Sequence, residues 1–221
     1  MFIPAVIVLA GCEKEPVASA AADARVQTIP LNDTLSRIIT ENVLLTNSHT
    51  WYIAGWVYVS NEATLHIEPG TVIKVIPQPA RNGNGSGGGL VITRGAGILA
   101  AGLNNLPICF QLTDTTAACS GGWAGIILLG RAPAGAGKQL ENEQLSSLNA
   151  STGLAYGGRY PQDSSGVLRH VHIQGIRCNN NKNKLPAGLL LLGAGSRTVV
   201  EDVIIQPLGE KPYYLNRRRL P

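Results

Sequence analysis

The residues best suited to chemistry in this sequence are two histidines, His170 and His172. They stand two positions apart in the alternating stretch LRHVHIQ, so in a strand both imidazoles project from one face. Two imidazoles on one face can share a metal ion, but the sequence offers no third ligand beside them. Val171 and Ile173 take the opposite face. We therefore interpret both histidines as solvent-facing strand residues and predict no metal site and no cofactor.

Carboxylates that could serve as acids, bases or calcium ligands are few. Glu201 and Asp202 are consecutive, so in a strand we expect them to point to opposite sides and not to serve one site. Asp163 opens the stretch DSSG, which is typical of a turn in which the aspartate bonds the backbone two residues on. A ligand role for Asp163 is the alternative. We predict no catalytic residues and expect that the chain is not an enzyme.

Other common functional signatures are incomplete. The stretch RNGNGSGGG, residues 81–89, lacks the Gly-Lys-Ser/Thr ending and the following helix of a phosphate-binding loop. No Gly-x-Ser-x-Gly elbow for a serine nucleophile occurs. The formal net charge is +4, and three of the positive charges lie together in residues 217–219. This balance gives no basic surface suited to nucleic acid, so no nucleic-acid partner is expected.

Aromatic side chains gather in the stretch TWYIAGWVYV. Trp56 and Tyr58 are two positions apart and share one face of a strand, and Trp51 begins the same stretch. Aromatic rings stack on the apolar faces of sugars, so Trp51, Trp56 and Tyr58 form a candidate glycan platform. The interpretation that we favour is structural: these rings cap the N-terminal end of the core.

Internal repeats indicate how the chain holds these residues. LHIEPGTVI, residues 65–73, matches LVITRGAGI, residues 90–98, at an offset of 25 positions. LRHVHIQ matches VEDVIIQ at an offset of 32, and GIILLG matches GLLLLG at an offset of 63, about twice 32. Repeats of short strands and turns without amphipathic helices predict a β-solenoid. A β-sandwich is the alternative, but its strands need not repeat.

The alternation of apolar and polar residues predicts which side chains face the core of each coil. In ATLHIEPGTVIKV, a Pro-Gly pair makes the turn between two strands. The runs GIILLG and GLLLLG are apolar throughout, so we expect strands that are buried on both faces or covered outside by a loop. From the first stretch the core should receive Leu65, Ile67, Val72 and either Ile73 or Val75.

The first twelve residues, MFIPAVIVLAGC, end in a motif that resembles a bacterial lipobox. The resemblance implies cleavage before Cys12 and attachment of diacylglycerol to its sulfur, so that acyl chains hold the protein at a membrane. The apolar run is too short for a spanning helix, and no basic residue precedes it as in an ordinary signal peptide. In lipoproteins that this motif resembles, a residue other than aspartate after the cysteine is compatible with sorting to the outer membrane, and Glu13 stands there.

Three further cysteines follow. Cys109 and Cys119 lie ten positions apart, a spacing that allows a disulfide in an exported protein. A pair of buried thiols is the alternative. Cys178 is then left over, and no Cys-x-x-Cys pair indicates structural zinc.

Three stretches, TWYIAGWVYVSNEATLHIEPGTVIK, GGWAGIILLGRAP and DSSGVLRHVHIQ, together resemble secreted and lipid-anchored β-helix proteins of Gram-negative bacteria. The resemblance covers residues 50–206 and implies an all-β, right-handed parallel β-helix. Because such proteins continue for further coils, we expect a helix incomplete at its C-terminal end, in a truncated or frame-shifted fragment. We predict a signal peptide at 1–12, a flexible tether that leads into the fold at 13–40, the β-helix at 41–206 and an irregular tail at 207–221.

The resemblance is to a largely uncharacterised family and implies an outer-membrane lipoprotein, facing the periplasm or the cell surface. Because a solenoid has a long, stiff outer face, we expect a non-catalytic module for binding or adhesion, with an extracellular glycan or protein as partner. Parallel β-helices also resemble pectate lyases, so a polysaccharide lyase or hydrolase, or an inactive remnant of one, is the first alternative. A structural subunit of a surface complex is the second.

Overall fold

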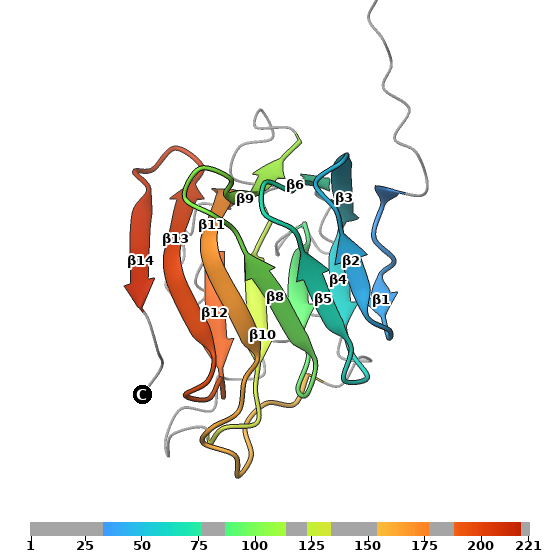
Figure 1. The fold of residues 1–221 in the computed structure, drawn as a ribbon, viewed down its shortest axis with the longest axis vertical. Helices are drawn as coiled ribbons and strands as arrows, with labels where there is room; N and C mark the ends of the chain where they lie inside the picture. Colours follow the sequence, from blue (N-terminus) through green and yellow to red (C-terminus); the bar gives the residue numbers. More distant parts are fainter. Residues whose placement is uncertain (1–32, 77–86, 114–122, 134–153, 177–187, 218–221) are drawn as a thin grey trace, which may run out of the picture.

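The computed structural model describes residues 33–76, 87–113, 123–133, 154–176 and 188–217, and their regular structure consists of short strands (Figure 1). The strands are β1 (Ile38–Ile39), β2 (Val43–Leu45), β3 (Thr50–Ala54), β4 (Trp56–Val59), β5 (Thr64–Ile67), β6 (Val72–Ile76), β7 (Gly89–Ile92), β8 (Gly97–Ala101), β9 (Ile108–Leu112), β10 (Gly125–Leu129), β11 (Gly166–Ile176), β12 (Gly188–Leu192), β13 (Val199–Pro207) and β14 (Tyr213–Arg217).

The strands form two sheets that wrap around one core. The smaller sheet has the order β1-β4-β7-β10-β12. The larger sheet runs β2-β5-β8-β11-β9-β6-β3, and β13 and β14 extend it from β11. Pairings between these strands are parallel except that of β13 with β14. Sequence neighbours thus lie on successive sides of a coil, which confirms the predicted parallel β-helix.

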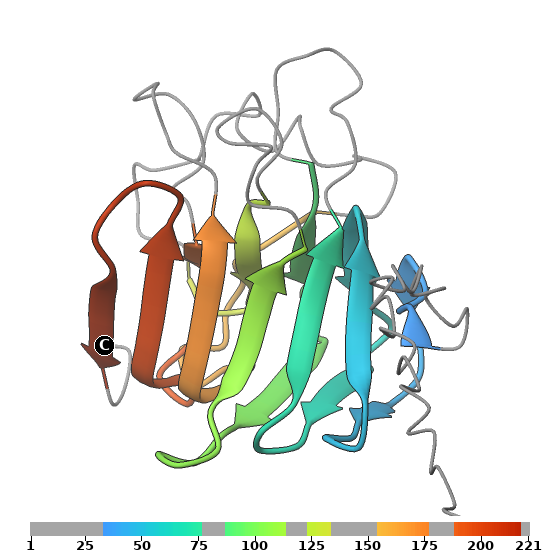
Figure 2. The same cartoon turned by 90° about the horizontal axis from the view of Figure 1, so that it is seen from above.

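The larger sheet is bent into two arms that share β11. The N-terminal part of β11 pairs with β8, and its part from Val171 to Ile173 pairs with β9 (Figure 2). The first arm therefore holds β2, β5, β8 and the start of β11, and the second arm holds β3, β6, β9 and the rest of β11. Together with the smaller sheet, the two arms give each coil three sides.

The sequence repeat at an offset of 25 does not give the positions that stack in neighbouring coils. Leu65 pairs with Ile98 of the next coil, and Leu90 pairs with Val57 of the preceding coil, so both pairs are 33 positions apart. The match aligns β5 with β7 and β6 with β8, and the two strands of each aligned pair lie on different sides of the coil. The match arose because every side uses the same strand, turn and strand pattern.

The other two repeats are confirmed as neighbours in the sheets. Val171 pairs with Val203, at the offset of 32. Gly125 pairs directly with Gly188, at the offset of 63. The second spacing is therefore one long coil and not two coils of about 32 residues.

The core contains the residues that alternation placed there, with one exception. Leu65, Ile67, Ile73 and Val75 are buried, whereas Val72 is half-buried and lies on the outer side of β6. The exception follows from register, since residues of one strand can face the core only at every second position.

The apolar strands β10 and β12 differ in burial. β10 is buried on both faces: Ile126 and Leu128 belong to the main core, and Ile127 and Leu129 to a second cluster outside the sheet. This confirms the prediction for GIILLG. In β12 the three central leucines are only half-buried, so GLLLLG is covered less completely.

The predicted irregular tail is wrong for its first part. After β13 the chain turns at Gly209 and returns as β14, which pairs antiparallel with β13. Leu208 and Leu215 pack against the main core cluster from this hairpin. The stretch YYLNR therefore forms a strand, with Leu215 turned toward the core. At the other end, β1 begins at Ile38, inside the segment predicted as a tether.

Candidate binding face

The two arms meet at a corner formed by two stacked residues, His170 and Asp202. Both have positive φ angles, 46° and 51°, which non-glycine residues adopt rarely. They lie one above the other, since Arg169 pairs with Glu201 and Val171 with Val203 on either side of them. The left-handed backbone turns the chain from one arm to the other without a loop.

This corner corrects the expectation that Glu201 and Asp202 point to opposite sides. Val200 and Val203 are both buried, so the two residues between them both lie on the outside. The positive φ of Asp202 interrupts the two-residue alternation that a regular strand would impose.

Four charged or titratable side chains therefore meet outside the corner. We call Arg169, His170, Glu201 and Asp202 the corner quartet. Arg169 Nε donates to Glu201 Oε2 at 2.9 Å, and His170 Nδ1 lies 3.7 Å from Asp202 Oδ2. The arrangement combines two carboxylates, a guanidinium and an imidazole, a set able to bind polar groups and to exchange protons.

Beyond the corner, His172 projects from the outer side of the second arm. It pairs in register with Cys109 of β9 and with Ile204 of β13. Burial lowers the pKa of His172, and nearby His170 lowers it further. Burial raises the pKa of the Cys109 thiol, which makes it a poor nucleophile near neutral pH. Both histidines face outward as predicted, and within the described ranges no group of three or more His, Cys, Asp or Glu side chains could hold a metal ion.

A row of polar side chains runs along the same arm, one from each coil. We call Lys74, Gln111, Gln174 and Gln206 the polar ladder. Lys74 pairs with Gln111, and Gln174 pairs with Gln206. Phe110 of β9 pairs with Ile173 of β11, and Gln111 and Gln174 are the next residues of these two strands. The row therefore continues from β9 to β11. All four side chains are half-buried or exposed.

A buried tryptophan fixes the middle of the ladder from inside. Trp123 is fully buried, and its indole Nε1–H donates to the carbonyl oxygen of Gln174 at 2.9 Å. Its ring stacks on Phe110, with 5.8 Å between ring centroids. Phe110 and Gln174 flank the junction of β9 and β11, so this contact holds both strands in register.

Beside the ladder lies a second row that is mostly apolar. It passes from Val72 through Cys109, His172 and Ile204 to Tyr214, each paired in register with the next. The Tyr214 side chain is 70% exposed. Figure 2 shows β6, β9, β11 and β13 side by side on one face, with β14 beyond them. We call the polar ladder and this row together the binding face.

The predicted aromatic platform is not assembled in one place. Trp51 belongs to β3 in the larger sheet, whereas Trp56 and Tyr58 belong to β4 in the smaller one. Tyr58 is only 3% exposed and stacks with Trp56 at a centroid distance of 6.5 Å. Trp51 packs against the core in the first coil, and its indole donates to the Thr46 carbonyl at 2.8 Å. For Trp51 the favoured interpretation as a cap fits this placement.

Asp163 has structural contacts. Its Oδ2 accepts the Arg131 backbone N–H at 3.0 Å and lies 3.5 Å from the Ser165 hydroxyl. The bond to Arg131 differs from the one predicted for the DSSG turn, because it joins the turn to the chain that follows β10 in the same coil. The carboxylate thus holds two chain segments together.

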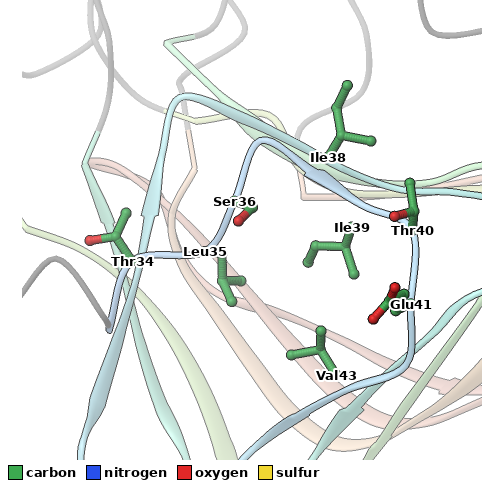
Figure 3. Close-up of a pocket in the computed structure, with 8 residues that line it drawn as sticks. All are labelled: Thr34, Leu35, Ser36, Ile38, Ile39, Thr40, Glu41 and Val43. Carbon is green, nitrogen blue, oxygen red and sulfur yellow. The ribbon is translucent and has the colours of Figure 1, made fainter.

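An open groove lies at the N-terminal coil, with a volume of about 260 Å³ (Figure 3). Aliphatic side chains line it, with three hydroxyl groups and the Glu41 carboxylate. Leu35 and Ile39 are also members of the main core cluster. The groove is therefore the exposed end of the core, and one carboxylate with hydroxyls offers little for catalysis.

A family model described as a pectate-lyase-like β-helix domain matches residues 37–207. The chain belongs to this family. No curated protein and no solved structure matches it. The matched span contains the corner quartet and the polar ladder but not Tyr214.

Several predicted features lie outside the described residues. These are the lipobox with Cys12, residue Cys178, and Cys119, the proposed partner of Cys109. Cys109 itself carries a free thiol. In the part of the chain that the structure describes, no helix is both long and apolar enough to cross a membrane.

Proposed function

We propose that this β-helix domain is a binding module for an extended glycan, carried at the outer membrane by a lipid on Cys12. The observation that carries the proposal is the polar ladder, which repeats one hydrogen-bonding side chain in each of four consecutive coils. Neighbouring strands are spaced about 4.8 Å apart, so the ladder offers regularly spaced contacts to a regularly repeating polymer.

The chemistry of the binding face suits sugars. Each glutamine amide both donates and accepts hydrogen bonds, and hydroxyl groups need both. The neighbouring row supplies apolar surface at Val72 and Ile204, and the exposed Tyr214 ring offers a stacking surface at one end. Polar and apolar contacts side by side match a sugar ring, which presents hydroxyl edges and C–H faces.

The test is binding to a glycan array by the wild-type protein and by a Gln111→Ala/Gln174→Ala variant. We expect the double variant to lose about tenfold in affinity for any glycan that the wild type binds, since each lost hydrogen bond contributes about 0.5–1.5 kcal/mol. Gln162→Ala is the matched control, because Gln162 is an exposed glutamine away from the ladder. Unchanged affinity in the double variant would exclude the ladder as the site.

The anchor is a separate part of the proposal with its own test. Membrane fractions and intact mass of the expressed chain should reveal a lipid adduct that is absent from a Cys12→Ser variant. A soluble wild-type chain without the adduct would remove the anchor and leave the glycan proposal intact.

A second candidate function, cleavage of the bound glycan, is favoured by the corner quartet. His170 and Asp202 could exchange protons, and Glu201 and Arg169 could orient a substrate beside them. The test is release of reducing ends from a glycan that the array identifies. Activity that falls at least about a hundredfold in Asp202→Asn would support catalysis; wild-type protein that releases no reducing ends would limit the function to binding.

A further inference from the structure

Arginines gather at a different corner, where the smaller sheet passes into the first arm. Arg94 follows β7, Arg131 follows β10 and Arg197 precedes β13. Arg159 lies in the described segment that leads into β11. We call Arg94, Arg131, Arg159 and Arg197 the arginine corner. It lies at the entrance to the first arm, whereas the polar ladder lies on the second arm, and neither the binding proposal nor the corner quartet uses it.

Close contacts bring the first three arginines together. The Arg131 guanidinium lies on Gly95, where it leaves no room for a Cβ atom. Gly95 directly follows Arg94, and its φ of 94° suits glycine. A Cβ at Gly158 would lie 3.3 Å from Arg94 Nη2, so that guanidinium reaches the residue next to Arg159.

Backbone hydrogen bonds hold these layers in place. The Tyr160 N–H donates to the Arg131 carbonyl at 3.1 Å, and the Arg197 N–H donates to the Asp163 carbonyl at 3.3 Å. The segment with Arg159 is therefore fastened between the turns that carry Arg131 and Arg197. The turns with Arg94, Arg131 and Arg197 thus belong to three consecutive coils, and the segment with Arg159 lies beside the turn of Arg131.

The positive charge of the corner is only partly neutralised by described residues. Arg131 pairs with Glu62 at 2.9 Å, but the Glu62 side chain is 78% exposed. The other nearby carboxylate, Asp163, accepts the backbone N–H of Arg131. Arg94, Arg159 and Arg197 are exposed and have no carboxylate partner within the described ranges, and Arg197 donates to the neutral Gln162 amide.

We propose that the arginine corner binds phosphate groups. A phosphate carries more than one charge and at least three acceptor oxygens, so guanidinium groups from adjacent layers can share it. A carboxylate has two oxygens and one charge, so fewer guanidinium groups can share it, and an exposed ion pair with it is weak. Phosphates could come from membrane lipid headgroups or from a soluble polyphosphate, and the same side chains would take either.

The experiment measures binding of inorganic tripolyphosphate to the full chain by isothermal titration calorimetry. We expect about tenfold weaker binding in the variant Arg94→Gln/Arg159→Gln, since two exposed charge pairs are lost. Arg37→Gln is the matched control, because it removes one exposed arginine elsewhere on the fold and should keep the wild-type affinity within about twofold. Circular dichroism verifies that each variant is folded.

A gain-of-function variant separates binding from a merely structural role. Glu62→Gln removes the carboxylate that competes for Arg131, so we expect affinity for tripolyphosphate to rise by about two- to fivefold. Equal affinity for malonate in place of tripolyphosphate, or equal loss in Arg37→Gln and in the double variant, would overturn the proposal.

A second experiment identifies the source of the phosphate. Vesicles of phosphatidylcholine with phosphatidylglycerol are sedimented with the protein. Co-sedimentation that the double variant loses supports lipid headgroups as the ligand, whereas tripolyphosphate binding without co-sedimentation supports a soluble phosphate. Neither result depends on the polar ladder. A failed glycan test therefore leaves the phosphate proposal intact, and a failed phosphate test leaves the glycan proposal intact.

Discussion

The outer side of the smaller sheet and the outer side of the second arm are built on the same coils but carry different residues. Both sheets turn aliphatic side chains to the shared core. Outside the smaller sheet, Tyr58, Val91 and Ile127 form a second buried cluster. Outside the second arm, the corresponding positions are Lys74, Gln111 and Gln174, which are half-buried. Inward residues thus define the coil, while outward residues decide whether a face is covered or available to a ligand.

The cover on the smaller sheet comes from the chain itself. Leu154 and Tyr156 pack against the second cluster from the segment before β11. In the described residues, the outer side of the smaller sheet is therefore covered by the chain's own side chains.

The largest expected effect comes from comparing two outward aliphatic residues, Ile127 and Leu99. Ile127 is buried in the second cluster, whereas Leu99 is 39% exposed on the first arm. Ile127→Ala should lower the free energy of unfolding by about 2–5 kcal/mol, and Leu99→Ala by less than about 1 kcal/mol. Urea denaturation measures both. Equal losses would contradict the view that the outer side of the smaller sheet is packed more tightly than the outer side of the first arm.

A smaller effect is expected from Trp123→Phe, which keeps an aromatic ring in the core but removes the bond to the Gln174 carbonyl. An unsatisfied buried acceptor costs about 1–3 kcal/mol, so we expect a loss of that size. The same denaturation experiment detects it. If the variant keeps full stability, Trp123 does not hold the polar ladder in place.

The next effect tests the corner between the two arms. His170→Val should cost about 1–2 kcal/mol, because a β-branched residue opposes a φ of 46°. His170→Asn should stay within about 0.5 kcal/mol of wild type, since asparagine tolerates this conformation. The melting temperatures of the two variants measure this difference. Similar melting temperatures would show that the corner tolerates a β-branched side chain as well as asparagine.

The smallest effect concerns pH. The pKa of His172 lies below its ordinary value of 6.5, so as pH falls the unfolded chain takes up this proton first. Stability should therefore decline as pH falls below about 6.5, and His172→Gln should make that decline shallower. Urea midpoints at about pH 7.5 and 5.5 measure the difference, with His66→Gln as the control. An identical decline in His172→Gln and wild type would exclude this contribution.

Much of this fold could be predicted from the sequence. Alternation identified Leu65 and Ile67 as core residues, and the apolar run before Gly130 indicated a strand buried on both faces. These patterns lie within single strands, so they can be recognised without knowing which strands pair. The stacking partner of Leu65 could not be obtained in this way, because similar strands on different sides of the coil match one another equally well.

The candidate site was harder to predict for two physical reasons. Glu201 and Asp202 share a side only because Asp202 adopts a left-handed backbone, and the expected alternation hid this. The polar ladder is made of single residues that come together only after the coils stack in register. One signal was available, since Gln174 and Gln206 end the repeat at an offset of 32.

The long coil between β10 and β12 has a consequence for assembly. Gly125 meets Gly188 after 63 positions, whereas Val43 meets Leu65 after only 22. Closing the longer loop costs roughly 1 kcal/mol more in chain entropy. The short N-terminal coils should therefore close more readily during folding than the long coil that joins β10 to β12.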